Sequence, residues 1–144
     1  MLKHIPPILS PELLYVMAQM GHGDELVLAD ANFPSVAIAK RLVRADGHAV
    51  PPLLKAILEL LPLDSFVSMP AAVMRRVDEP DKSAPIWAEF QTLLDSVDGK
   101  HVGVERVERF AFYERAKQAF AVVATGETAL YGNLILKKGV IAPG

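Results

Sequence analysis

The ten residues Glu25–Pro34, with the sequence ELVLADANFP, decide the fold of this chain. The first five, Glu25–Ala29, form a short apolar run that is typical of a buried strand. The last five, Asp30–Pro34, contain aspartate, asparagine and proline, which indicate a loop. Ligands of open α/β sheets gather at the carboxyl ends of strands. A buried strand that ends in polar residues therefore predicts both a sheet and a place for a ligand.

Helices and strands alternate outward from this strand. A helix is expected before it, because Ser10 can cap free backbone N–H groups, Pro11 suits the first helical position and Gly21 favours a helix end. After it, the pattern predicts a short helix over Val36–Leu42, a helix over Leu53–Leu61, a β-like stretch over Ser65–Val77 that Pro70 interrupts, a helix over Ile86–Val97, a strand over Val102–Val107, a helix over Arg109–Gln118, and strands over Phe120–Thr125 and Asn133–Leu136. This alternation predicts one α/β domain over residues 1–144, with a central sheet covered by helices.

Composition and charge narrow the class of protein. Apolar residues make up 51% of the chain and the mean hydropathy is +0.26, so the chain is expected to fold rather than stay disordered. A net charge of −2 argues against nucleic acid or an anionic membrane as the main partner. No apolar stretch reaches the roughly 18 residues of a membrane helix and no signal-peptide pattern is recognised, so a cytoplasmic location is expected. The high apolar content also predicts that some surface is buried between subunits.

Several kinds of chemistry require residues or motifs that the sequence lacks. Because there is no cysteine, a disulfide framework, a thiolate zinc site and a cysteine nucleophile are excluded. The four histidines do not occur in an HxxxH or HExxH spacing, so no metal site is predicted. There is also no Walker A loop, no GxGxxG and no GxSxG motif, which leaves nucleotide-driven chemistry, dinucleotide cofactors and serine hydrolysis without support.

Two polar residues flank the first expected strand. His22 lies between two glycines directly after the first helix, where its ring could reach a cleft and transfer protons near neutral pH. The alternative for His22 is a histidine in a surface turn. Asp30 follows the strand, where it could orient His22 or hold a sugar hydroxyl. The alternative for Asp30 is a loop aspartate that forms an Asx turn.

The second half of the chain offers three further candidates. Arg109 stands where an expected strand gives way to a helix, although a solvated helix face is the commoner setting for such a residue. Tyr131 and Asn133 are two residues apart, so in extended backbone both side chains project to the same face. A phenol beside an amide suits hydroxyl recognition, and the tyrosine could also relay a proton. The alternative is an aromatic strand residue beside a turn.

Five blocks of sequence carry a family resemblance, namely Leu9–Leu14, Met20–Glu25, Ala29–Pro34, Arg109–Ala116 and Thr125–Asn133. In order, and over nearly the whole chain, they resemble the family of sugar mutarotases that contains the fucose mutarotases and the D-ribose pyranases. The sequence FAFYER of residues 110–115 and Tyr131-Gly132-Asn133 are similar to the fucose branch. Residues 65–100 contain no motif that we recognise.

The resemblance implies a fold, an assembly and a reaction. It implies a three-layer α/β sandwich that assembles into rings, often decamers, with clefts between neighbouring subunits. It implies cofactor-free interconversion of the α and β anomers of L-fucose by acid/base ring opening and closure. In the family's pattern, His22 corresponds to the acid/base group. Asp30, Arg109, Tyr131 and Asn133 correspond to substrate-contacting residues.

Three other functions stay open on the sequence. Within the family, the alternative is conversion between the pyranose and furanose forms of D-ribose. Outside catalysis, the chain could be a monosaccharide-binding module without turnover. A purely structural assembly protein is the third alternative.

Overall fold

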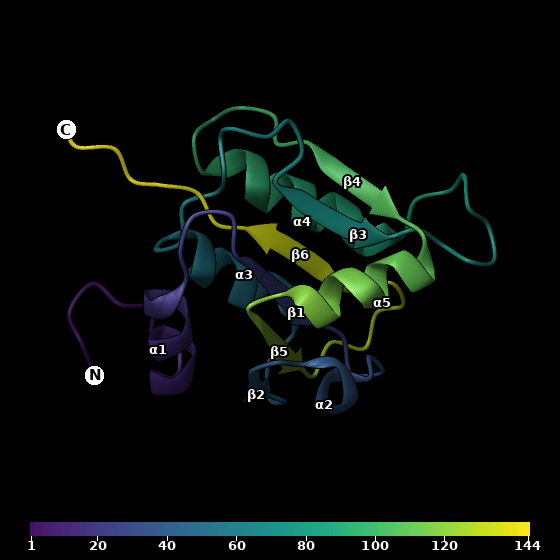
Figure 1. Ribbon diagram of the computed structural model, residues 1–144, viewed down its shortest axis with the longest axis horizontal. Helices are drawn as coiled ribbons and strands as arrows, with labels where there is room; N and C mark the ends of the chain where they lie inside the picture. The colour runs from purple at the N-terminus through teal and green to yellow at the C-terminus, as the bar shows by residue number, and fades with distance from the viewer.

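In a computed structural model of residues 1–144, a six-stranded mixed sheet lies between two layers of helices (Figure 1). In chain order, the elements are α1 (Pro11–Gln19), β1 (Glu25–Ala29), α2 (Ser35–Ile38), β2 (Leu42–Ala45), α3 (Val50–Leu58), β3 (Ala71–Met74), α4 (Pro85–Ser96), β4 (Val104–Val107), α5 (Arg109–Gln118), β5 (Ala121–Thr125) and β6 (Leu134–Lys137). The strand order is β2-β5-β1-β6-β3-β4. No helix combines the length and the apolarity that crossing a membrane requires.

Strand β6 runs opposite to the other five strands. It pairs antiparallel with β1 on one side and with β3 on the other, whereas β1, β2 and β5 are mutually parallel and β3 is parallel to β4. The carboxyl ends of five strands therefore meet at one edge of the sheet, together with the start of β6. We call this the carboxyl edge. The opposite edge, from which the C-terminus leaves β6 toward the left of Figure 1, is the amino edge.

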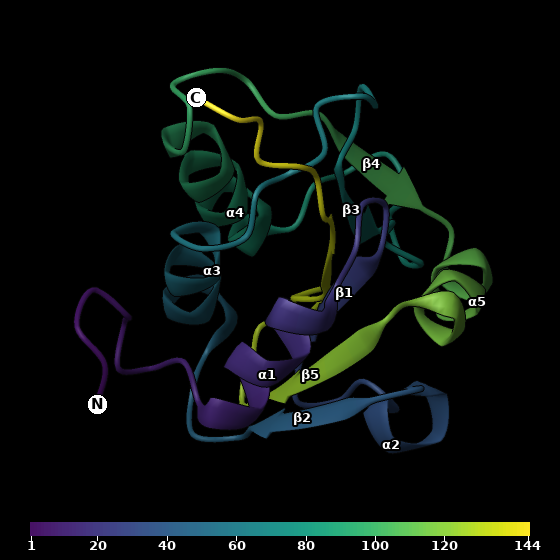
Figure 2. The same ribbon diagram turned by 60° about the vertical axis from the view of Figure 1, so that its left-hand side comes forward.

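Each face of the sheet carries its own apolar core. Alternate residues of β1 point to opposite faces, so Leu26 and Leu28 belong to one core while Val27 and Ala29 belong to the other. The larger core joins the sheet to α1, α3 and α4, and the smaller core joins it to α2 and α5. Figure 2 shows α3 and α4 on one side of the sheet and α5 and α2 on the other. The expected three-layer α/β arrangement is thus confirmed.

The predicted elements agree with the structure except around β2 and at some boundaries. The helix expected over Val36–Leu42 is a single turn, Ser35–Ile38, and Leu42 instead begins the edge strand β2, which the sequence did not predict. Only Val43 of that strand is buried, so no apolar run marks it. Helix α3 begins at Val50 rather than at Leu53, because proline fits the first turn of a helix.

An ion-pair network fastens α5 to the sheet. The Arg115 guanidinium on α5 donates to both carboxylate oxygens of Glu25 on β1, at 2.6 to 3.1 Å, and to Glu105 on β4 at 2.8 Å. The side chains of Arg115 and Glu25 are only 22% and 15% exposed. Bidentate geometry and partial burial make this pair stronger than an ordinary surface ion pair.

We expect Arg115→Met to lower the free energy of unfolding by about 2 kcal/mol, because the half-buried Glu25 carboxylate loses its partner. Urea unfolding followed by circular dichroism measures this. The matched control is Lys117→Met on the same helix, whose ion pair with Glu114 is exposed. The control should change stability by less than about 0.5 kcal/mol. Equal losses for the two variants would contradict the prediction.

Candidate active site

A small cavity of about 190 Å³ opens at the carboxyl edge of the sheet. Its lining comes from the loop after β1, the end of β3, helix α5 and the segment before β6, and consists of Asp30, Asn32, Phe33, Met74, Tyr113, Leu130, Tyr131 and Asn133. The volume is below the 300 to 1,000 Å³ typical of pockets for drug-sized ligands. Carboxylate, amide and phenol groups beside apolar walls suit a small ligand rich in hydroxyl groups.

Two hydrogen bonds join Asp30 and Asn133, which are 103 residues apart in the sequence. The Asp30 backbone N–H donates to Asn133 Oδ1 at 2.7 Å, and Asn133 Nδ2 donates to Asp30 Oδ2 at 3.1 Å. The Asn32 N–H donates to the other carboxylate oxygen at 3.0 Å. Burial raises the pKa of the Asp30 carboxyl above its ordinary value, against the opposite effect of these hydrogen bonds. The result is a fixed acceptor inside the cavity.

Tyr131 is held in an unusual backbone conformation. Its φ is +58°, a left-handed value that costs free energy for a bulky side chain. The Trp87 indole N–H donates to its carbonyl oxygen at 3.0 Å. Its hydroxyl accepts from the Val77 N–H at 3.0 Å and donates to Asp78 at 3.1 Å. A hydrogen bond from Arg76, and secondarily the one from Tyr131, lowers the pKa of Asp78. The phenol hydroxyl thus already donates and accepts a hydrogen bond within the loop after β3.

Arg109 reaches the cavity only through Tyr113. Its side chain is exposed at the first position of α5 and does not line the cavity. Its Nε donates to the Tyr113 hydroxyl at 3.4 Å, and its guanidinium lies 5.6 Å from the centre of that ring. Tyr113 lines the cavity, although it is not among the predicted site residues. The spacing of four residues from Arg109 on a helix is the signal that could have found it.

His22 lies at the amino edge, in the loop between α1 and β1. Its Nε2 is 3.1 Å from the Oδ1 of Asp64, and its ring centre is 5.3 Å from that of Phe66. The His22 side chain is 45% exposed, whereas Asp64 is 4% exposed. The Phe66 backbone N–H, and to a lesser degree His22, lowers the pKa of Asp64. The pair resembles a general base with a carboxylate that orients it.

Within one chain, His22 is far from the other four predicted site residues. Strand β1 separates it from Asp30, and its five residues alone span about 13 Å at the usual rise of a strand. The suggestion that Asp30 orients His22 is wrong within the chain, because Asp64 does so. Asp64 was not predicted, because it lies 42 residues from His22 and outside the five blocks that carry the family resemblance. The structure brings together Asp30, Tyr131 and Asn133.

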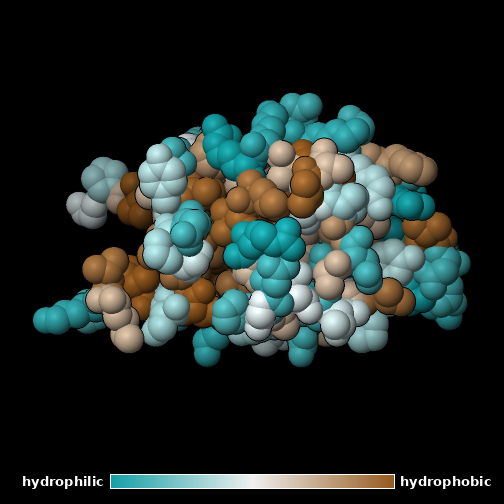
Figure 3. Space-filling model, turned by 90° about the horizontal axis from the view of Figure 1, so that it is seen from below, coloured by the Kyte–Doolittle hydropathy of each residue, from teal (hydrophilic) through white to brown (hydrophobic).

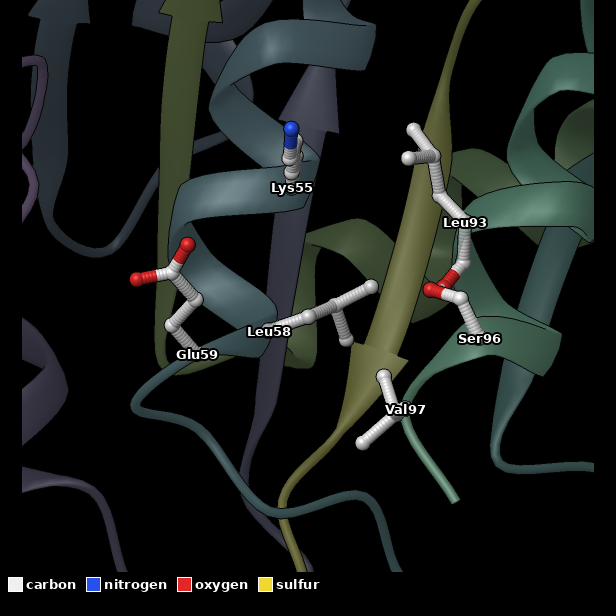
Figure 4. A pocket seen from close by; sticks show the side chains of 6 residues that line it. All are labelled: Lys55, Leu58, Glu59, Leu93, Ser96 and Val97. Atoms are coloured by element: carbon white, nitrogen blue, oxygen red, sulfur yellow. The ribbon is translucent and has the colours of Figure 1, made fainter. Parts of the chain in front are cut away.

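A second hollow lies on the outside of the larger helical layer. It measures about 410 Å³ and lies between the carboxyl ends of α3 and α4 (Figure 4). Its lining consists of Lys55, Leu58, Glu59, Leu93, Ser96 and Val97. None of the predicted site residues reaches it, so the candidate active site is the smaller cavity together with the His22–Asp64 pair.

Comparison with known proteins identifies the family. The model of the RbsD / FucU transport protein family matches residues 3–141, and the chain belongs to this family. It is 56% identical over 147 residues to the fucose mutarotase of Homo sapiens, covering 98% of this chain and 95% of that protein. It is 60% identical over 148 residues to the fucose mutarotase of Danio rerio, with 99% and 95% covered. The family resemblance seen in the sequence is therefore confirmed.

Solved structures give the same result for the fold. The crystal structure of the fucose mutarotase from Streptococcus pneumoniae in complex with L-fucose has a TM-score of 0.92 and 48% identity to this chain, with 98% of this chain and 100% of that chain covered. The structure of Bacillus subtilis RbsD complexed with D-ribose has a TM-score of 0.71 at 23% identity, with 99% and 100% covered. The latter shares the fold alone.

We expect Asn133→Asp to make stability depend on pH, because it sets a second carboxyl against Asp30. Repulsion raises the folded-state pKa of the pair above the unfolded value of about 3.9. The folded state then binds more protons than the unfolded state, so the free energy of unfolding falls as pH rises from about 4 toward 7, relative to the unsubstituted protein. Urea unfolding at several pH values measures this. Asn133→Ala, which adds no carboxyl, should lose stability by the same amount at every pH. If the stability difference between Asn133→Asp and the unsubstituted protein does not change with pH, the prediction is wrong.

Proposed function

We propose that this chain is an L-fucose mutarotase, an isomerase that interconverts the α and β anomers of L-fucose within a single domain over residues 1–144. The observation that carries the proposal is its likeness, at 48% identity over 98% of the chain, to a fucose mutarotase crystallised with L-fucose. The curated fucose mutarotases, at up to 60% identity, support the same activity. The small cavity at the carboxyl edge, with carboxylate, amide and phenol groups beside apolar walls, supports a ligand of this chemistry.

The reaction requires two proton transfers. One group removes the proton of the anomeric hydroxyl while another protonates the ring oxygen, and the bond between C1 and the ring oxygen breaks. Rotation about the C1–C2 bond and the reverse transfers close the ring with the other configuration. The proposed acid/base group is His22, oriented by Asp64. No electrons are exchanged, so no redox cofactor is required.

The second proton carrier is a tyrosine. Tyr131 can serve as a relay only through Asp78, because its hydroxyl proton is donated to that carboxylate. Tyr113 accepts a hydrogen bond from Arg109 and leaves its own proton free. Tyr113 is therefore the stronger candidate to exchange a proton with the sugar, while Tyr131 contacts it.

The remaining residues bind the sugar. Asp30 and Asn133 present a carboxylate and an amide that suit two sugar hydroxyl groups. Arg109 stays protonated and fixes Tyr113 in place, in addition to the direct contact that the family resemblance implies.

The active site is proposed to form between neighbouring copies of the chain in a ring, a decamer by family resemblance. The amino edge of one copy, with His22, faces the cavity of the next copy. An exposed aromatic side chain accompanies His22 on this edge, since Phe66 packs against the His22 ring and is 74% exposed. In Figure 3, brown apolar residues reach the surface toward the left, beside the projecting chain ends. Contact between two different edges of identical subunits builds a ring when the rotation between neighbours closes. The cytoplasmic location stays a prediction.

Exchange NMR tests the proposed activity. Catalytic amounts of the protein should speed exchange between the α and β signals of L-fucose, with and without chelator. His22→Gln should slow this exchange roughly 100-fold, the usual scale of general acid/base catalysis. A protein that binds L-fucose without speeding exchange would be a sugar-binding module. Faster exchange of the D-ribose pyranose and furanose signals, with none for L-fucose, would indicate the alternative enzyme of the family.

Mixing variants tests the shared site. His22→Gln and Asp30→Asn lie on opposite edges. In rings assembled from an equal mixture of the two variants, about a quarter of the interfaces combine two unsubstituted edges. These rings should therefore regain about a quarter of the activity. His22→Gln mixed with Asp64→Asn is the control, because both changes lie on the amino edge and leave no intact site. Light scattering that gives a mass near the 15.7 kDa of one chain, or mixed rings without recovery, would contradict the shared site.

A further inference from the structure

Glu127 is a buried carboxylate that lies beside the sugar cavity without lining it. Its residue is 7% exposed. One carboxylate oxygen accepts the backbone N–H of Val50 and the other accepts that of Ala129, both at 3.1 Å. The two groups lie on different elements, at the start of α3 and in the segment between β5 and β6.

Helix α3 depends on this distant residue for its N-terminal cap. Its N-cap residue, Ala49, has no side-chain acceptor, and the helix continues from Val50 with Pro51 and Pro52, which have no N–H. Val50 therefore carries the one free donor before Leu53, and Glu127 accepts it. A carboxylate at this position also interacts favourably with the helix dipole.

The backbone of Glu127 connects the two segments that supply the polar groups of the cavity. Its carbonyl oxygen accepts the Ala31 N–H at 2.8 Å, directly after Asp30. Its N–H donates to the Thr125 hydroxyl at 3.2 Å, and that hydroxyl donates to the Ala29 carbonyl at 2.6 Å. One residue thus links the end of β1, the end of β5 and the start of α3.

Gly132 allows Glu127 to pack against the cavity segment. A Cβ atom at Gly132 would lie 2.9 Å from Cγ of Glu127, 3.0 Å from the Ala129 carbonyl oxygen and 3.5 Å from Cβ of Asp30. A side chain at position 132 would therefore displace Glu127. The glycine between Tyr131 and Asn133 permits contact between the cavity wall and the carboxylate behind it.

We infer that Glu127 is a positioning residue for sugar binding. It anchors the Asp30 segment and the segment of Tyr131 and Asn133 to the rigid start of α3, and so fixes the spacing between their polar groups. The inference rests on the proposed function for its ligand. Misplacement of positioning groups by about 1 Å can cost roughly 100-fold in rate.

The test compares Glu127→Gln with the unsubstituted protein. Glutamine keeps the shape but turns an N–H₂ group toward one of the two backbone donors, so one hydrogen bond is lost. We expect the KM for L-fucose in exchange NMR to rise about 10-fold with a smaller change in kcat, because His22 and Asp64 are untouched.

Ser10→Ala is the matched control. Ser10 caps α1 by accepting the Leu13 N–H at 3.1 Å, away from the cavity. Both variants should lower the midpoint temperature of thermal unfolding, because each weakens a helix cap. Only Glu127→Gln should raise KM. If the KM of Glu127→Gln rises no more than that of Ser10→Ala, Glu127 is only a helix cap and the inference is wrong.

Gly132→Ala supplies an independent check. It should raise KM in the unsubstituted protein and raise it less in a Glu127→Ala background, where Cγ is gone. Additive effects would contradict the proposed contact.

Amide hydrogen exchange separates this inference from the proposed function. If the unsubstituted protein does not speed the interconversion of the α and β anomers of L-fucose, the proposed function is wrong. The Ala31 amide, whose partner is the backbone of Glu127, should still exchange faster in Glu127→Gln because its segment is released. An unchanged Ala31 amide would show that Glu127 does not position this segment.

Discussion

The paired hydrogen bonds between Asp30 and Asn133 are the contact on which the carboxyl edge depends. Asp30 directly follows β1 and Asn133 directly precedes β6, and these two strands lie side by side in the middle of the sheet. Because β6 is antiparallel to β1, its beginning lies where β1 ends. Residues 103 apart therefore meet, and both are buried with their polar atoms satisfied. The cavity therefore exists because β6 runs antiparallel to β1.

The same topology divides the chemistry between two edges. The carboxyl edge holds the groups suited to hydroxyl recognition, and the amino edge holds an exposed histidine beside a buried aspartate. Neither edge alone carries out the proposed reaction, because the hydroxyl-binding groups and the His22–Asp64 pair are separated by the length of β1. The proposed function therefore requires assembly, because the fold places the two sets of groups at opposite edges of the sheet.

The sequence predicted most of the fold because most elements carry a local signal. The apolar run of β1 and the serine and proline at the start of α1 are examples. Strand β2 carries no such signal, since it lies at the edge of the sheet with only Val43 buried. The position of β6 between β1 and β3 also has no local signature, because strand order is decided by packing between distant segments.

The candidate site was predicted in part for the same reason. Asp30, Tyr131 and Asn133 stand beside strands and could be read as neighbours at one edge. Asp64 could not, because it meets His22 only through the pairing of its own segment with Lys137 and Lys138. Tyr113 lies on a helix, where an aromatic residue more often packs in a core, as its neighbour Phe112 does, so its place in the sequence alone does not mark it as a site residue.

The strand order has a consequence for how the chain folds during synthesis. None of β1, β2 and β3 neighbours another of the three, and β1 finds both of its partners, β5 and β6, only after residue 121. The nascent chain thus carries the apolar strand β1 with two unpaired sides until β5 and β6 have been made. Sheets closed by such long-range pairs fold slowly, and their unpaired intermediates are prone to aggregate. The arrangement that creates the cavity therefore also leaves the growing chain prone to aggregate until β5 and β6 can pair with β1.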